Sequence, residues 1–389
     1  MLRGLMSPYL FEGEVHAAIR ASVRGFAQQH IAPFGAEWEE NEEFPIELYR
    51  TAARAGVTGI GYPEALGGQG GDLSHVLVAS DEMTIAGRSV GTLVGLGSHG
   101  IALPPIVRFG NAEQQARFVT PCLTEGKIAA LAVTEPGGGS DVASLATRAE
   151  RDGDFYVVDG AKTFITSGTR ADFVTCAVRT GGAGHGGISM LVIEKGTPGF
   201  SVSKKLKKTG WWASDTAELH FEGCRVPVAN RIGPENGAFP MIMMNFAGER
   251  LMLAGQCVAI AELAYRESIA YAKERKAFGK TLSGFQVTRH KLADMASRIA
   301  AARALTGETL VRVLRNEPPN VVAGLASMAK NVATDMCSFV CDQAVQIHGG
   351  YGYMRESLVE RLYRDARLYP IGGGTREIMN EVIAKTEGY

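Results

Sequence analysis

A single long helix is the strongest constraint that the sequence places on the fold. From Gly237 to Lys273 the chain contains no proline after Pro240, and most of its residues are Met, Ala, Leu and Ile. These residues are good or acceptable helix formers, and a helix of such apolar composition must be buried by its neighbours. The stretch therefore predicts a long, buried helix around which the rest of the chain is organised.

Glu249 lies within this predicted helix. Its neighbours three and four positions away are Asn245, Phe246, Met252 and Leu253. We expect this face to be dry, and loss of hydration raises the pKa of a carboxyl group towards neutrality. Such a carboxylate suits the removal of a proton from a weakly acidic C–H. The alternative is a structural glutamate that reaches solvent or pairs with Arg250.

Helical periodicity is found at both ends of the chain. In the first 126 residues, apolar residues recur at three- and four-residue spacing, and prolines and glycines separate the segments. After Pro234 the pattern is again helical. The predicted helices cover residues 14–32, 45–55, 73–86, 237–273, 284–315, 321–347 and 359–369 followed by 375–386. This order predicts an N-terminal α-helical domain (residues 1–126) and a C-terminal four-helix bundle (residues 236–389).

The middle of the chain alternates with a period of two, as strands do. The predicted strands cover residues 129–134, 146–151, 155–165, 173–178, 188–194 and 216–221. Asp152-Gly153 indicates a hairpin, and no helix intervenes, so we expect an antiparallel β-barrel or sandwich over residues 127–235. The basic run from Lys204 to Lys208 is interpreted as a solvated loop, with a place near a phosphorylated ligand as the alternative. The whole chain is predicted to be an α+β multidomain protein.

The composition excludes several classes of function. The net charge is −1, with 46% hydrophobic and 21% charged residues, which argues against nucleic-acid binding. The six cysteines show neither a C-x-x-C pair nor a zinc-like spacing with histidine, so we expect reduced thiols and no metal site. Met1–Pro8 is too short for a secretory signal, and no stretch reaches the roughly 20 apolar residues of a membrane span. We therefore predict a cytoplasmic protein.

Two glycine-rich motifs could bind a dinucleotide. Residues 182–187 match G-x-G-x-x-G, but a strand pattern follows, whereas that fingerprint must open a helix. We interpret this motif as a hairpin loop. The second motif, from Leu131 to Asp141, runs from a strand into Thr134-Glu135-Pro136-Gly137-Gly138-Gly139-Ser140. Its unpaired backbone N–H groups and small hydroxyl donors suit a phosphate or the edge of a flat heteroaromatic ring.

This second motif resembles the flavin-binding signature of the acyl-CoA dehydrogenases, and further segments resemble the same family in the same order. They are Lys162–Gly168, in which Phe164 stands where many members carry Trp, Asp215–Leu219 with Arg225–Pro227, Arg275–Lys280 with Gln286, Gln346–Tyr353, and Gly374–Glu377. The resemblance implies FAD as the cofactor. It implies contacts with FAD from Leu131, Val133, Thr134, Gly139, Ser140, Phe164, Ile165, Thr166, Arg275, Phe278, Gln286, Gln346, Ile347, Gly349, Gly350, Thr375 and Glu377. Arg275, with a permanently charged planar fork, would reach the pyrophosphate across a dimer.

The sequence departs from the family pattern at the expected base. Many members carry a C-terminal Tyr-Glu-Gly-Thr motif, and the matching stretch here, Gly372-Gly373-Gly374-Thr375, has no acid. In the isovaleryl-CoA and long-chain branches the base stands on the long helix before Arg-Leu, and Glu249-Arg250-Leu251 matches that arrangement. The resemblance therefore implies that Glu249 is the catalytic residue. It further implies that Ser140, Arg250, Gly373 and Gly374 contact the substrate.

The implied reaction is α,β-dehydrogenation of an acyl-CoA thioester to a trans-2-enoyl-CoA. Electrons would pass to an electron-transfer flavoprotein, and the chain would form a homotetramer built as a dimer of dimers. Three alternatives remain open on the sequence alone. They are a flavin-dependent oxidase or monooxygenase on the same scaffold, a catalytically silent acyl-CoA-binding protein, and a helical scaffold without a cofactor.

Overall fold

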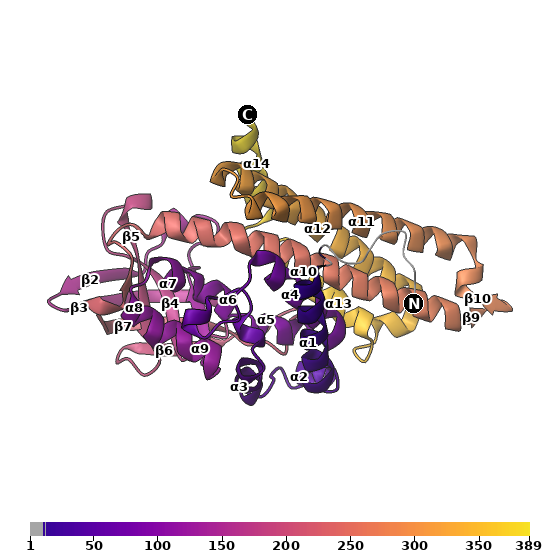
Figure 1. The fold of residues 1–389 in the computed structure, drawn as a ribbon, viewed down its shortest axis with the longest axis horizontal. Coiled ribbons are helices and arrows are strands. Elements are labelled where there is room, and N and C mark those ends of the chain that lie inside the picture. The colour runs from indigo at the N-terminus through magenta and orange to yellow at the C-terminus, as the bar shows by residue number, and fades with distance from the viewer. Residues whose placement is uncertain (1–10, 12) are drawn as a thin grey trace.

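The computed structural model describes residue 11 and residues 13–389, so the prediction about Met1–Pro8 lies outside the described residues. The long helix α10 (Ala238–Glu274) runs along the longest axis of the molecule, as Figure 1 shows. The predicted helix over 237–273 is thus confirmed to within one residue. The sheet lies at one end of α10, and the short β9–β10 hairpin (Lys276–Ala277 and Lys280–Thr281) lies at the other.

The N-terminal part of the chain folds into short helices, which pack against α10 and the sheet (Figure 1). They are α1 (Glu14–His30), α2 (Gly35–Glu40), α3 (Glu47–Arg54), α4 (Leu73–Gly87), α5 (Val90–Leu96), α6 (His99–Ala102), α7 (Pro104–Phe109), α8 (Ala112–Gln114) and α9 (Thr120–Thr124). Asp72 caps α4 by accepting a hydrogen bond from the Ser74 amide at 2.8 Å. Among the described residues no single helix is long and apolar enough to cross a membrane. Only the bent pair Val90–Leu96 with His99–Phe109 reaches that length and composition, when its two parts are taken together.

The middle of the chain forms one mixed sheet. Its strands are β1 (Ala129–Ala132), β2 (Arg148–Asp152), β3 (Phe155–Thr166), β4 (Phe173–Arg179), β5 (Ile188–Glu194), β6 (Phe200–Lys205), β7 (Thr216–Pro227) and β8 (Arg231–Ile232). The order is β6-β7-β3-β2-β4-β5-β8, and β1 also pairs with β4. The hairpin predicted at Asp152-Gly153 joins β2 to β3, and the glycine-rich residues 182–187 connect the antiparallel β4 and β5, as predicted.

Two features of the predicted β-barrel are wrong. Within the described part of the chain no pairing joins the outer strands β6 and β8, so the sheet does not close into a barrel. The sheet is also not wholly antiparallel, because β1 and β2 both pair with β4 in parallel. The β2–β3 hairpin stands between β1 and β4 in the sequence and supplies the crossover that parallel neighbours require.

Part of the lysine run lies in a strand that the sequence did not reveal. Lys204 and Lys205 belong to the edge strand β6, whereas 206–208 follow it as a loop. From Ser201 to Lys205 every residue of this strand is exposed, so no alternation of buried and polar residues marks it in the sequence. Lysines on an open edge also discourage pairing with other chains.

The C-terminal part is a bundle of three long helices and two shorter ones. The helices α10, α11 (Gln286–Leu314) and α12 (Pro319–His348) pack on one another, and α13 (Leu358–Ala366) and α14 (Arg376–Glu387) pack against α12. The predicted bundle is confirmed. The helix predicted from 321 begins earlier, at Pro319, because proline is well suited to the first turn of a helix.

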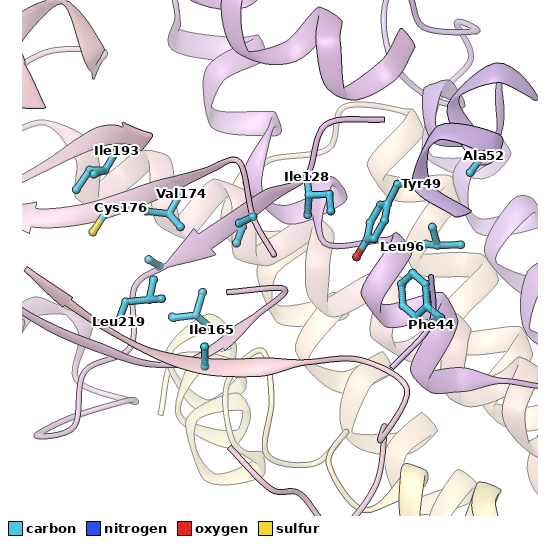
Figure 2. Close-up of a cluster of buried hydrophobic side chains, with 14 of the residues drawn as sticks. Phe44, Tyr49, Ala52, Leu96, Ile128, Ile165, Val174, Cys176, Ile193 and Leu219 are labelled. Atoms are coloured by element: carbon cyan, nitrogen blue, oxygen red, sulfur yellow. The ribbon is translucent and has the colours of Figure 1, made fainter. Parts of the chain in front are cut away.

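A hydrophobic core joins the N-terminal helices to the sheet. Figure 2 shows Phe44, Tyr49 and Leu96 from the helical part on one side of this core and Val174 and Leu219 from the sheet on the other, with Ile128 between the two sides. A second cluster connects β1, β4 and β5 to the first turns of α10: Val133, directly after β1, is buried in it together with Met241 and Ile242 of α10. These two clusters fix the end of β1 relative to the N-terminal third of α10. The candidate site lies in this part of the molecule.

Candidate active site

Glu249 lies on α10 with its side chain only partly exposed. Burial removes water from the carboxylate and raises its pKa to about 7, against the opposing effects of the positive charges on Arg250 and Lys330. No hydrogen bond or ion pair within residues 13–389 engages this carboxylate. It is therefore a free proton acceptor whose pKa lies close to neutral pH.

A turn of three glycines faces this carboxylate. A Cβ placed on Gly373 would lie 3.4 Å from Glu249 Oε1 and 2.6 Å from Leu253 Cδ1. Gly373 also has a φ of +65° and Gly374 a φ of +101°, conformations that strongly favour glycine. A side chain at position 373 would therefore project towards the Glu249 carboxylate and would clash with Leu253.

Two cations hold this turn from the protein interior. Lys330 of α12 is 1% exposed, and its Nζ donates to the carbonyl oxygen of Gly372 at 2.6 Å and to that of Gly374. Arg250 is also buried, and its Nε donates to the carbonyl oxygen of Gly373 at 3.3 Å. Lys330 was not among the residues predicted from the sequence. The sequence does contain one indication of its role: Lys330 shares a helical face with Ala326, Ala333 and Thr334. All three are buried, and a lysine on a buried face is rare unless its charge has partners.

The segment after β1 is fixed by a buried ion pair. Glu135 accepts from Lys162 Nζ at 2.8 Å and from the amides of Ala146 and Thr147 at 2.6 and 2.9 Å. Lys162 is fully buried and also donates to the carbonyl of Val133. The glycines that follow are exposed, and a Cβ on Gly137 or Gly138 would meet nothing within 4 Å. The chain thus holds this loop rigidly at its base and leaves the backbone open above it.

The predicted cofactor-binding residues around this loop differ in how far their side chains are exposed to solvent. Thr134 and Thr166 are half-buried, Ser140 is exposed, and Phe164 is 68% exposed with a φ of +61° at a bulge between β3 and β7. The side chains of Val133 and Ile165 are buried in hydrophobic clusters, so contact with a ligand would have to come from their backbone. Leu131 is half-buried and packs against the same cluster as Val133. An exposed aromatic ring, small hydroxyls and open glycines fit a flat heteroaromatic cofactor such as FAD.

A second group of predicted residues lies beyond the C-terminal end of α10. Arg275, Ile347, Gly349 and Gly350 line a cleft of about 620 Å³, together with Tyr271 and His348. Phe278 is 97% exposed, and Gln286 and Gln346 are also exposed. A guanidinium beside two open glycines fits a pyrophosphate that must approach the backbone closely.

Arg275 and Glu249 are far apart within one chain. A helix rises about 1.5 Å per residue, so Arg275 lies roughly 39 Å along α10 from Glu249. Thr375 and Glu377 stand at the start of α14, next to the glycine turn, and therefore belong to the Glu249 group. The structure thus brings Glu249, Arg250, Gly373, Gly374, Thr375 and Glu377 together, and it places Arg275 and its neighbours elsewhere.

Three family models match the chain. They describe the N-terminal domain of acyl-CoA dehydrogenases over residues 13–126, the middle domain over 130–224 and the C-terminal domain over 236–387. Similar proteins include the mitochondrial isobutyryl-CoA dehydrogenase of Bos taurus, 40% identical over 93% of this chain and 86% of that protein. The mitochondrial long-chain specific acyl-CoA dehydrogenase of Sus scrofa is 39% identical over 97% of this chain and 87% of that protein. The crystal structure of a probable acyl-CoA dehydrogenase from Mycobacterium abscessus has a TM-score of 0.95 and 50% identity, covering 97% of this chain and 99% of that one.

Proposed function

Because the chain belongs to the acyl-CoA dehydrogenase family and is an FAD-dependent oxidoreductase acting on acyl-CoA, we propose that Glu249 is its α-proton base. The product would be a trans-2-enoyl-CoA. The observation that carries this assignment is a carboxylate with a pKa of about 7 that has no bonding partner among the described residues and faces the turn where other members carry their acid. Bound FAD supplies the acceptor for the β-hydrogen, which leaves as hydride.

The glycine turn is proposed to polarise the substrate. Removal of the α-proton places negative charge on the thioester oxygen, and preorganised N–H donors stabilise such charge. No hydrogen bond within the described chain uses the amide N–H groups of Gly373 and Gly374, so they are free to donate to this oxygen. Arg250 would hold the turn on the CoA side, and Ser140 would contact the substrate from the loop after β1.

The separation of the two cofactor groups supports a shared site. Thr134, Gly139, Ser140, Phe164 and Thr166 are proposed to hold the flavin end, with backbone contacts from Leu131, Val133 and Ile165. Arg275, Phe278, Gln286, Gln346, Ile347, Gly349 and Gly350 would hold the pyrophosphate and adenosine end. The reacting end of FAD must stand beside Glu249, and Arg275 lies roughly 39 Å from Glu249 along α10, too far for one FAD to reach both in a single chain. We infer that the second group serves the FAD of a partner subunit, and that dimers pair into a homotetramer.

The first prediction concerns the cofactor itself. The purified protein should be yellow, with FAD bound non-covalently, because the hydroxyls, open glycines and exposed Phe164 fit a flavin. The absorption spectrum of the purified protein, and of the supernatant after heat denaturation, would measure this. Well-folded protein that stays colourless after incubation with excess FAD would contradict it.

The second prediction concerns Arg275. Arg275→Ala should weaken FAD binding and subunit association together, since the side chain is proposed to contact the partner's cofactor. Loss of a charge-assisted contact should cost roughly 1.5 to 3 kcal/mol, or about one to two decades in affinity. FAD titration and sedimentation would measure both quantities. Lys273→Ala, which removes an exposed cation from the same end of α10 but outside the cleft, is the control. Unchanged affinity and assembly in Arg275→Ala would assign Arg275 another role.

Anaerobic mixing with a panel of acyl-CoA thioesters tests the proposed function. Loss of the flavin absorbance with at least one thioester is expected, and the fastest one identifies the acyl group. A binding protein without catalysis would keep its absorbance with every thioester.

The reduced protein then distinguishes the electron acceptors. We propose an electron-transfer flavoprotein as the acceptor, in the cytoplasm, where the six free, buried cysteines would stay reduced. The reduced flavin should reoxidise rapidly with that flavoprotein and slowly in air. Rapid reoxidation in air would instead indicate an oxidase or monooxygenase.

A further inference from the structure

Lys330 is buried in the bundle at a place where a cation is costly. It is 1% exposed, and its amine stands against the glycine turn and near Glu249. Burial lowers the pKa of Lys330 to about 8, with a smaller lowering effect from Arg250. The amine therefore remains mostly protonated at neutral pH. A desolvated charge of this kind is retained only where its bonds compensate for the lost hydration.

The bonds of Lys330 fix the orientation of peptide groups. A peptide bond is planar and trans, so the carbonyl of Gly372 and the N–H of Gly373 point in opposite directions from one rigid plane. Lys330 binds that carbonyl, which turns the N–H of Gly373 away from α12. Arg250 binds the next carbonyl, at Gly373, and so fixes the N–H of Gly374 in the same way. A turn of three glycines has little stiffness of its own, so these two cations supply the rigidity.

We propose that Lys330 is a positioning residue for dehydrogenation: by binding the carbonyl of Gly372, it orients the Gly373 N–H towards the thioester oxygen. This inference rests on the function proposed above. It differs from a purely structural role for Lys330, in which the amine would only anchor α14 to α12. A structural anchor would affect folding and cofactor retention, but it would change neither the polarisation of the substrate carbonyl nor the titration of Glu249.

The charged groups around the two residues are few. Arg250 on α10 and Lys330 on α12 are the charges that act on Glu249, and both lower its pKa. Lys330 in turn is affected by Arg250, by Glu249 and by the Cys257 thiol. Removal of the Lys330 charge would leave Arg250 as the only opposing cation in the described part of the chain. The pKa of Glu249 should then rise further.

Lys330→Met tests the proposal in the FAD-loaded protein. It keeps the length of the side chain and removes both the charge and the donors. The thioester that reduces the parent fastest would be used, with its enoyl product, labelled with carbon-13 at the carbonyl, as the probe for isotope-edited infrared spectroscopy. The variant should lose much of the downward shift of the bound carbonyl stretch. Flavin reduction should fall roughly 10- to 100-fold, the effect of a small misplacement at the reacting centre. The acidic limb of its pH profile should move upward.

Two further variants make the test decisive. Lys330→Gln is neutral but can still donate to one carbonyl, so it should move the pH limb as Lys330→Met does while keeping more of the infrared shift. If Lys330→Met does not fold, Lys330→Gln carries the test. Arg303→Met is the matched control, because Arg303 is also a buried bundle cation and it pairs with Glu262 at 3.0 Å, far along α10 from Glu249. It should lower the melting temperature without moving the infrared band or the pH limb.

The possible results distinguish the proposed dehydrogenase function from the proposed role of Lys330. A parent protein whose flavin is reduced by no acyl-CoA would overturn the proposed function and this inference with it. A parent that is reduced, while the Lys330 variants keep the parent's carbonyl band and pH limb, would overturn the inference alone and leave Lys330 as an anchor.

Discussion

Glu249→Gln should reduce flavin reduction by a factor on the order of 100 to 10,000 while acyl-CoA binding survives. Glutamine keeps the size of the side chain and can still form hydrogen bonds, but it cannot accept the α-proton. Anaerobic stopped-flow mixing would measure the reduction rate, and titration with the enoyl product would measure binding. Glu262→Gln is the matched control on the same helix, since Glu262 pairs with Arg266 and Arg303 and lies away from the glycine turn. It should lose stability and retain the parent's rate.

The pH dependence of the parent follows from the same carboxylate. Only the ionised form accepts a proton, so the rate should rise through a pKa of about 7 and then level off, and Glu249→Gln should lack this limb. The folded-state pKa is raised above its ordinary value of 4.5, so ionisation opposes folding. The parent should lose stability as pH rises from about 4.5 to 7, and Glu249→Gln should be the more stable protein above pH 7, by roughly 1 to 3 kcal/mol. Melting curves at pH 5 and pH 8 would measure this. Reduction of Glu249→Gln at the parent's rate would remove Glu249 as the base.

Sequence periodicity predicted the elements whose burial follows a regular pattern. The helix α10 was predicted within one residue at each end, because its apolar residues continue without a proline. The strand β5 was predicted with its observed bounds, because a short, mostly apolar segment between turn residues is typical of a buried strand. The strand β6 was missed, since a mostly exposed edge strand carries no burial pattern. The closure of a sheet depends on which edges meet in space, so the predicted barrel had no basis in local pattern.

The same distinction applies to the candidate site. The apolar helical neighbours of Glu249 predicted a dry carboxylate, and its pKa of about 7 agrees with that prediction. Its assignment as the base came from the resemblance of Glu249-Arg250-Leu251 to the family branches whose base stands on the long helix. Lys330 and Gly372 are 42 positions apart, and no local pattern indicates that the lysine reaches the turn. The pairing of Glu135 with Lys162 likewise joins a loop to a strand 27 positions later. Contacts of this kind depend on tertiary packing, and they hold the backbone around the predicted residues.

Moving the base from α10 to the glycine turn should restore part of the activity that its loss removes. The double change Glu249→Gly with Gly373→Glu places a carboxylate on a Cβ that lies 3.4 Å from the present position of Glu249 Oε1. The rate should recover roughly 10-fold or more over Glu249→Gly alone, still below the parent. Recovery is partial because a non-glycine residue at a φ of +65° costs roughly 1 to 2 kcal/mol, and because the new Cβ would lie 2.6 Å from Leu253 Cδ1.

Two comparisons determine whether position limits this recovery. Leu253→Ala, added to the double change, opens the space beside residue 373 and should raise the rate further, whereas in the parent it only creates a cavity. Gly373→Glu without the change at 249 should fall below the parent, because two carboxylates would crowd one site and repel each other. Flavin reduction by the fastest acyl-CoA, measured in all of these variants, tests whether catalysis depends on where the carboxylate stands. If neither the double nor the triple change exceeds Glu249→Gly, residue 373 cannot direct a carboxylate to the α-carbon in this protein.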